Sequence, residues 1–152
     1  MLAKDVMQKD PIAVSTDTTI EGVAQLMIRH AISGFPVVDA SKKVVGVVSE
    51  MDLMRKEIKP HEPGVWQVCV WGVSNSKVAE YADALRKYMA KTAGEIMTSP
   101  AVSVEVDEPL ETVGNLMFEK KIKRVIVTDR GRLAGVISRS AFTKLFLDKK
   151  AL

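Results

Sequence analysis

The sequence is poor in the residues that build disulfides and metal sites. Among its 152 residues there is one cysteine, Cys69, and there are two histidines, His30 and His61. A single cysteine excludes an intramolecular disulfide and is typical of a reducing compartment, so we expect a cytoplasmic protein. Because these three residues follow no metal-ligand spacing, we expect no metal site.

Long apolar runs and concentrated charge are also absent. No stretch approaches the roughly 20 apolar residues that a membrane-spanning helix needs, so we expect no membrane association. The 22 lysines and arginines stand against 19 acidic residues, and the resulting charge of +3 is dispersed. A nucleic-acid-binding surface usually shows a basic stripe or a groove-entering motif, and we therefore expect no nucleic-acid partner.

Catalytic motifs are missing as well. The sequence contains no Walker A or Gly-x-Gly-x-x-Gly run, which are the usual loops that hold phosphates. It shows no recognisable Ser/His/Asp or Cys/His arrangement for nucleophilic catalysis. We therefore expect that the protein is not an enzyme.

An internal repeat dominates what the sequence does contain. Similar residues recur in the same order at a shift of about ninety residues, which chance similarity rarely produces. The aligned pairs are Asp5-Val6-Met7 with Glu95-Ile96-Met97, Pro11 with Pro100, Ile20 with Leu110, Val23 with Val113, Met27 with Met117, Ile32 with Ile122, and Gly46-Val47-Val48-Ser49 with Gly135-Val136-Ile137-Ser138.

Each copy predicts the same succession of elements. Apolar residues at helical spacing follow Ile20 and Leu110, with Asp17 or Thr18 and then Asp107 as the expected caps. Short β-branched runs separated by polar turns predict paired strands, and a helix follows each pair. The strands are expected at 35–38 and 44–48 and at 125–127 and 133–137, and the helices at 50–58 and 139–147. This pattern predicts an α/β (α+β) fold of two β-α-β-β-α repeats, at 1–58 and 93–148.

An inserted segment, 59–92, separates the repeats. Its apolar stretch 65–71 contains both tryptophans, Trp66 and Trp71. Ser76 is the expected cap of a following helix with Val78, Tyr81, Ala82, Leu85 and Met89 on one face. The insert is either a lid or spacer that packs on the edge of the body, or a contact surface for a protein partner, since exposed aromatic patches often mark contacts.

The first copy contains Asp5-Val6-Met7, Pro11, Asp17-Thr18-Thr19-Ile20, the run from Ile32 to Asp39, and the run from Gly46 to Leu53, and the second copy follows it more loosely. In these residues each repeat resembles a CBS domain, and the tandem pair resembles a Bateman module. The resemblance implies a pseudo-twofold axis between the repeats and a nucleotide cleft. It also implies AMP, ADP or ATP as a regulatory ligand, with S-adenosylmethionine as a further candidate, and assembly into a homodimer.

The same resemblance assigns Ser49 and Asp52 to the ligand, through a phosphate and the ribose hydroxyls respectively. A helix amino terminus after a strand is also suited to phosphate binding. Ser-x-x-Asp can equally serve as a local helix cap without any ligand, and the two functions are compatible. Further candidates are Ile32, Ser33, Gly34, Phe35 and Pro36 against the adenine, and Thr18 and Thr19, which are near the cleft by resemblance or are simply helix caps.

The second copy departs from this pattern. Its aligned run is Ser138-Arg139-Ser140-Ala141, so the aspartate is replaced by alanine. Arg139, Lys123 or Arg124 could bring positive charge to a phosphate there. We therefore expect one competent site at Ser49 and Asp52, and a second that is degenerate or differently selective.

Three functions remain open from the sequence. The first is a stand-alone regulatory module that binds an adenosine-containing ligand. The second is a partner-binding or structural module that uses the insert, with a vestigial cleft. The third, which the missing catalytic barrel disfavours, is a small enzyme related to IMP dehydrogenase.

Overall fold

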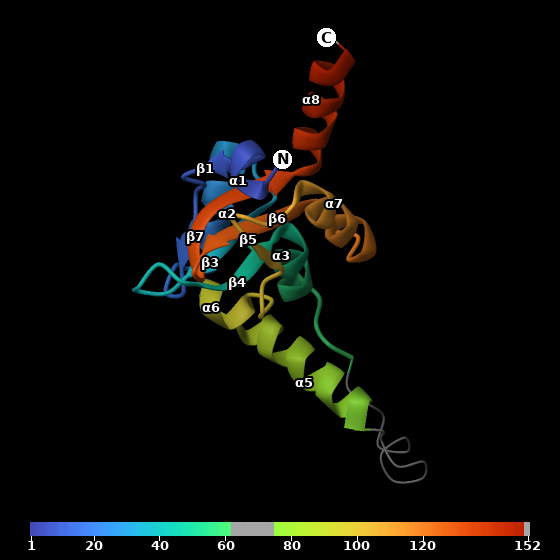
Figure 1. The fold of residues 1–152 in the computed structure, drawn as a ribbon. Helices are drawn as coiled ribbons and strands as arrows, with labels where there is room; N and C mark the ends of the chain where they lie inside the picture. Colours follow the sequence, from blue (N-terminus) through green and yellow to red (C-terminus); the bar gives the residue numbers. More distant parts are fainter. Residues whose placement is uncertain (62–74, 151–152) are drawn as a thin grey trace.

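The computed structural model describes residues 1–61 and 75–150 (Figure 1), which form two similar halves. The elements of the first half are α1 (Ala3–Val6), β1 (Gln8–Lys9), β2 (Val14–Ser15), α2 (Ile20–His30), β3 (Gly34–Val38), β4 (Val44–Ser49) and α3 (Glu50–Glu57). The connecting helix α5 (Asn75–Met89) and α6 (Ala93–Ile96) follow, and then β5 (Ser103–Glu105), α7 (Leu110–Glu119), β6 (Arg124–Asp129), β7 (Arg132–Ser138) and α8 (Arg139–Lys150).

The two halves share one strand topology. In the first half, β2 is parallel to β3 and β3 is antiparallel to β4. In the second half, β5 is parallel to β6 and β6 is antiparallel to β7. The inward side chains of these β-branched strands pack against an amphipathic helix in each half, α2 or α7, and so form two cores. The predicted α/β fold with two repeats is confirmed.

The amino-terminal caps differ from the sequence prediction. Thr19, and not Asp17 or Thr18, occupies the cap position of α2, where its hydroxyl accepts a hydrogen bond from the Gly22 N–H at 3.1 Å. Pro109 occupies the cap position of α7, whereas Asp107 forms an ion pair with Lys4 at 2.5 Å. The apolar periodicity does not determine which of several adjacent polar residues lies one residue before the helix.

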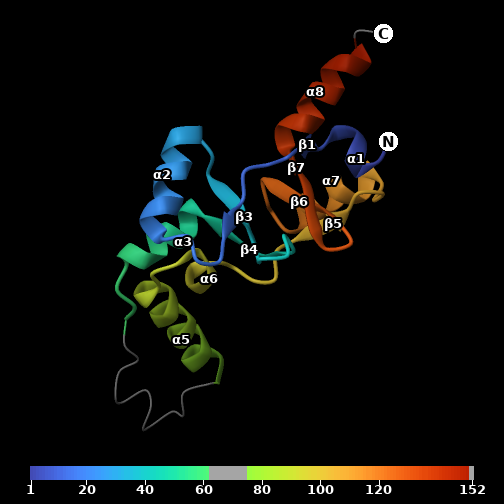
Figure 2. The same ribbon diagram turned by 90° about the vertical axis from the view of Figure 1, so that its left-hand side faces the viewer.

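The segment that opens each repeat belongs to the opposite half. β1 pairs antiparallel with β7 of the second repeat, so Gln8 lies opposite Val136. In the equivalent position of the first sheet, Thr98 forms an antiparallel bridge with Val47. Figure 2 shows α1 and β1 beside β7, and α6 beside β4. The sheets and cores therefore do not follow the sequence boundaries at 58 and 93.

Two equivalent glycines permit this crossing. A Cβ on Gly46 would lie 2.5 Å from Met97 Sδ and 2.9 Å from the Thr98 carbonyl oxygen. A Cβ on Gly135 would lie 2.6 Å from Met7 Sδ. These separations are well below van der Waals contact, so each methionine packs directly over a glycine of the other repeat.

The connecting helix α5 confirms the predicted helix, and its apolar residues Leu85 and Met89 are exposed. Ser76 lies within the helix and is not its cap. Leu85 and Met89 of the predicted apolar face are 39% and 65% exposed, whereas Lys87 is 4% exposed. The apolar stretch 65–71 lies outside the described residues. Within the ranges that the structure describes, no helix has the length and apolar character needed to cross a membrane.

Candidate functional site

A cleft of about 1510 Å³ lies between the two halves, and both contribute to its walls. The first half supplies the loop and strand from Ile32 to Pro36, together with Ser49 at the end of β4. The second half supplies the run from Lys120 to Arg124, together with Ser138, Ser140 and Lys144. Because the halves share a topology, equivalent loops face each other across the cleft.

The wall from Ile32 to Pro36 combines apolar side chains with backbone that other elements hold in place. All five of these residues line the cleft, and Phe35 and Pro36 are buried. The Ser33 carbonyl accepts a hydrogen bond from the Glu50 N–H at 3.0 Å. The Gly34 carbonyl accepts one from Arg124 Nη1, across the cleft, at 3.4 Å. This wall therefore presents Ile32 and the polar groups of Ser33 and Gly34 to the cleft, and the buried Phe35 and Pro36 hold it from behind.

Ser49 and Asp52 are brought together at the start of α3. Ser49 is the cap residue, and its N–H and its hydroxyl each donate to Asp52 Oδ2 at 2.9 Å. The capping arrangement that the Ser-x-x-Asp spacing allows is therefore present. Ser49 lines the cleft, but Asp52 is not among the lining residues and is 4% exposed.

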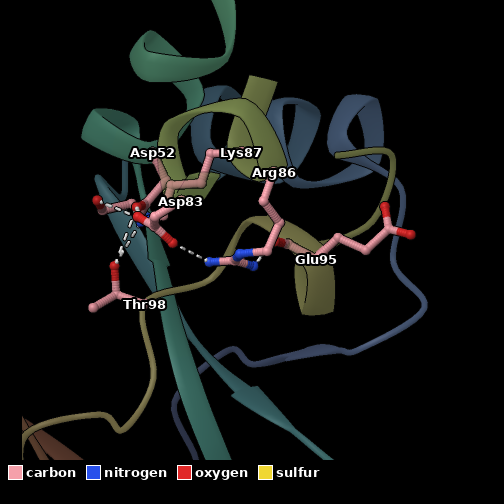
Figure 3. Close-up of polar contacts among 7 residues, drawn as sticks. Asp52, Asp83, Arg86, Lys87, Glu95 and Thr98 are labelled. Carbon is pink, nitrogen blue, oxygen red and sulfur yellow. Dashed lines mark hydrogen bonds and ion pairs between the residues drawn. The ribbon is translucent and has the colours of Figure 1, made fainter. Parts of the chain in front are cut away.

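The second oxygen of Asp52 is bound by two side chains from outside α3. Lys87 Nζ donates to Asp52 Oδ1 at 3.1 Å, and Thr98 Oγ1 donates to the same oxygen at 3.2 Å. Lys87 Nζ also lies 3.3 Å from Thr98 Oγ1. Figure 3 shows Lys87 reaching from α5 and Thr98 from the segment after α6 toward Asp52. Thr98, like Ser49, lines the cleft, so Asp52 lies one hydrogen bond behind its wall.

Neighbouring charges fasten α5 to α6. Arg86 forms an ion pair with Asp83 at 2.9 Å and donates to the Glu95 carbonyl oxygen (Figure 3). The hydrogen bond from Arg86 lowers the pKa of Asp83. Hydrogen bonds from the backbone N–H groups of Lys91 and Thr92 lower the pKa of Glu95. Both carboxylates are therefore held in their charged form. Glu95 caps α6, and Asp83 pairs within α5 with Arg86, which makes the contact to α6.

The second half presents hydroxyl and basic groups to the cleft. Ser138 and Ser140 share a hydrogen bond of 2.6 Å, and both line the cleft, as do Lys123, Arg124 and Lys144. Arg139 does not line it; the Arg139 N–H donates to the Lys123 carbonyl at 3.2 Å, in the position equivalent to the Glu50 contact in the first half. No carboxylate stands where Asp52 stands in the first half, because the aligned residue is Ala141.

Thr18 and Thr19 lie outside this cleft. Thr19 caps α2, and Thr18 Oγ1 accepts a hydrogen bond from the Ser15 N–H at 3.1 Å. Neither threonine is among the lining residues. In this structure both hydroxyls serve the local turn and helix.

Sequence reasoning missed Lys87, Thr98 and Lys144. Thr98 follows Met97 in the repeat, so its position next to the opposite half could have been inferred once the crossing was known. Lys87 lies in the insert, which has no repeat partner, and no pattern marked it. Within residues 1–61 and 75–150, no group of three or more histidine, cysteine or acidic side chains is arranged to hold a metal ion.

The fold is similar to solved structures of CBS-domain proteins. The structure of Arabidopsis thaliana CBSX2 in complex with AMP has a TM-score of 0.81 and 25% identity and covers 97% of each chain. The CBS domain pair of protein MJ0100, in complex with 5′-methylthioadenosine and S-adenosyl-L-methionine, has a TM-score of 0.69 and 25% identity and covers 98% of each chain.

Among curated proteins, the uncharacterized protein MJ1426 of Methanocaldococcus jannaschii is 29% identical over 147 residues, which cover 91% of this chain and 87% of that protein. Inosine-5′-monophosphate dehydrogenase of the same organism is 28% identical over 137 residues, and these cover 22% of the enzyme. The similarity to this dehydrogenase is therefore confined to a small part of it.

The family comparison covers most of the chain. The CBS domain model matches twice, at residues 3–59 and 93–148. These two ranges are the repeats that share a strand topology, and the segment between them contains α5. The chain belongs to the CBS domain family, as a tandem pair.

Proposed function

We propose that this protein is a regulatory module that binds AMP, ADP or ATP in the cleft between its two CBS domains. The observation that carries the proposal is the pairing of the wall from Ile32 to Pro36, which presents Ile32 and polar backbone groups, with a basic and hydroxyl-bearing wall on the other half. A nucleotide has the same division between a flat base and a charged phosphate. The AMP complex of CBSX2 supports this choice of ligand.

In the proposed complex the adenine lies against Ile32, Ser33, Gly34, Phe35 and Pro36, and Ser49 donates to a phosphate or ribose oxygen. Asp52 accepts from ribose hydroxyls. Ser138, Lys123 and Arg124 contact phosphates from the second half, and Arg139 supports them through the backbone of Lys123.

The charge of the cleft favours nucleotides over S-adenosylmethionine. Six basic residues line it, namely Arg55, Lys120, Lys121, Lys123, Arg124 and Lys144, against three acidic ones, Asp5, Asp10 and Glu50. A positive cleft attracts phosphates and repels a sulfonium cation. We therefore propose that affinity rises from AMP to ATP and is lowest for S-adenosylmethionine.

A thermal-shift panel of AMP, ADP, ATP and S-adenosylmethionine tests this function. A ligand at one hundred times its Kd stabilises the folded state by about 2.7 kcal/mol, which raises the Tm by about 5–11 °C for a chain of this size. Lys123→Met should weaken ATP binding more than AMP binding. Lys77→Met, which removes an exposed charge on α5 outside the cleft, is the matched control. If no adenosine compound shifts the Tm at millimolar concentration, the proposal is wrong.

The exposed face of α5 supports a second candidate, in which the insert is a contact surface for a protein partner or a second copy of the chain. Leu85 and Met89 are exposed on this helix. Light scattering on the native chain and on a Leu85→Ser/Met89→Ser variant tests it. A lower molecular mass for the variant than for the native chain supports a homodimer through α5. Equal masses of the two proteins contradict a homodimer through this helix.

We propose that the protein has no catalytic activity. The match to inosine-5′-monophosphate dehydrogenase covers 22% of that enzyme, and the cleft described here contains no recognised catalytic arrangement. Turnover of IMP with NAD would contradict this proposal.

A further inference from the structure

The carboxylate of Asp52 has its hydrogen-bonding capacity fully used. A carboxylate offers about four acceptor positions. Oδ2 takes the N–H and the hydroxyl of Ser49, and Oδ1 takes Lys87 Nζ and Thr98 Oγ1. Asp52 therefore cannot accept from a ribose until one of these donors leaves.

The two oxygens of Asp52 differ in how readily they exchange partners. The Ser49 donors belong to the same helix turn and are fixed by the cap of α3. The donors on Oδ1 come from α5 and from the segment after α6, which are separate elements. Thr98 lines the cleft, whereas Lys87 does not. The two ribose hydroxyls of a ligand that reaches Asp52 past Ser49 and Thr98 would together take both acceptor positions of Oδ1, which displaces Lys87 as well as Thr98.

Lys87 would then lose the only carboxylate that it contacts among the described residues. Its side chain is 5% exposed, and a buried ammonium without a counter-ion is strongly unfavourable. The ammonium could regain water only if α5 moved away from α3. The ribose and α5 are therefore alternative partners of one carboxylate oxygen.

We propose that Lys87 competes with the ligand's ribose for Asp52, so that docking of α5 weakens nucleotide binding and nucleotide binding releases α5. By thermodynamic linkage, the free energy by which docked α5 weakens nucleotide binding equals the free energy by which bound nucleotide weakens the docking of α5. The inference rests on the proposed nucleotide site. It gives the insert a role that the sequence left open: α5 reports occupancy of the cleft.

Calorimetric titration of Lys87→Met with AMP tests the competition. A hydrogen bond to a charged group is worth about tenfold or more in affinity, so the variant should bind AMP about tenfold more tightly than the native chain. Lys77→Met is the matched control, because Lys77 is an exposed lysine of the same helix and lies outside the cleft. Its affinity should stay within about threefold of native. Unchanged or weaker AMP binding by Lys87→Met would overturn the proposal.

Hydrogen exchange on the native chain gives a readout that needs no variant. Saturating AMP should accelerate exchange of the α5 amides, in 75–89, while those of β3 and β4 are slowed. Unchanged or slower exchange in α5 with AMP bound would refute the inference and leave the proposed function intact. If the native chain binds no AMP, ADP or ATP, the proposed function fails, and the inference fails with it.

Discussion

The crossing of the two repeats predicts which pairs of substitutions compensate each other. Gly46→Ala places a methyl group 2.5 Å from Met97 Sδ and 2.9 Å from the Thr98 carbonyl oxygen. Gly135→Ala places one 2.6 Å from Met7 Sδ and 2.9 Å from the Gln8 carbonyl oxygen. Each substitution overpacks a contact between one repeat and the opening segment of the other.

Overpacking of this kind costs about 1–3 kcal/mol, and we expect the upper part of that range because a backbone oxygen is among the obstructing atoms. A loss of about 2–3 kcal/mol lowers the Tm of a chain of this size by about 4–12 °C. The methionine thioether at each site is flexible, whereas the backbone carbonyl is not. Truncating the methionine to alanine should therefore relieve part of the clash, with a coupling free energy of about 1–2 kcal/mol between the glycine and methionine substitutions.

Urea denaturation of the four single variants and their four cross-combinations measures this coupling. Met97→Ala should rescue Gly46→Ala and leave Gly135→Ala unchanged, whereas Met7→Ala should do the reverse. The single methionine variants are the controls, because each loses some core packing by itself. If Met7→Ala rescued Gly46→Ala instead, each opening segment would pack on its own repeat, and the crossed arrangement would be refuted.

Three further predictions concern single residues. Lys87→Met leaves the buried Asp52 carboxylate without its counter-ion and should lower the unfolding free energy by about 3 kcal/mol in urea; a loss below about 0.5 kcal/mol would show that the pair is not desolvated. Thr19→Ala removes the cap of α2 and should lower the unfolding free energy in urea by about 1 kcal/mol. Asp17→Ala should change it by less than about 0.5 kcal/mol, and a larger effect at Asp17 would contradict the cap assignment. The Ser41 hydroxyl and the Lys43 N–H lower the pKa of Asp39 from 3.8, so the stabilisation by this carboxylate is present above pH 3.8 and is lost as the pH falls through the lower folded value. Carboxyl NMR titration should show Ser41→Ala raising the pKa of Asp39 toward 3.8, and an unmoved pKa would contradict the assigned cause.

Much of each repeat could be predicted from local sequence. The β-branched run around Val37 and the periodic apolar residues from Ile20 to Met27 bury their side chains within one unit, so strand and helix period identify them directly. The strands β3, β4, β6 and β7 form where they were expected, and the helices that follow them begin at Glu50 and Arg139 as predicted. The Ser-x-x-Asp spacing also identified a cap that the structure contains.

The environment of the candidate site depended on contacts between segments far apart in the chain. Lys87 lies between Leu85 and Met89 in α5, yet the lysine is buried and these two apolar residues are exposed, because Asp52 offers Lys87 a carboxylate at 3.1 Å. An ion pair between residues 35 positions apart leaves no periodic signal. The apolar pattern of α5 could not indicate that charge pairing, rather than apolar burial, orients the helix.

Local sequence patterns are enough to identify a duplicated β-α-β-β-α unit, because each repeat carries its own periodicity and turns. It could not determine which half receives each opening segment. Met7 and Met97 are equivalent, as are Gly46 and Gly135, so either pairing satisfies the same pattern of a methionine over a glycine. The exchange is seen only in the folded chain, where Met97 lies over Gly46 and Met7 lies over Gly135. That exchange brings Thr98 to Asp52 and joins the two halves around one cleft.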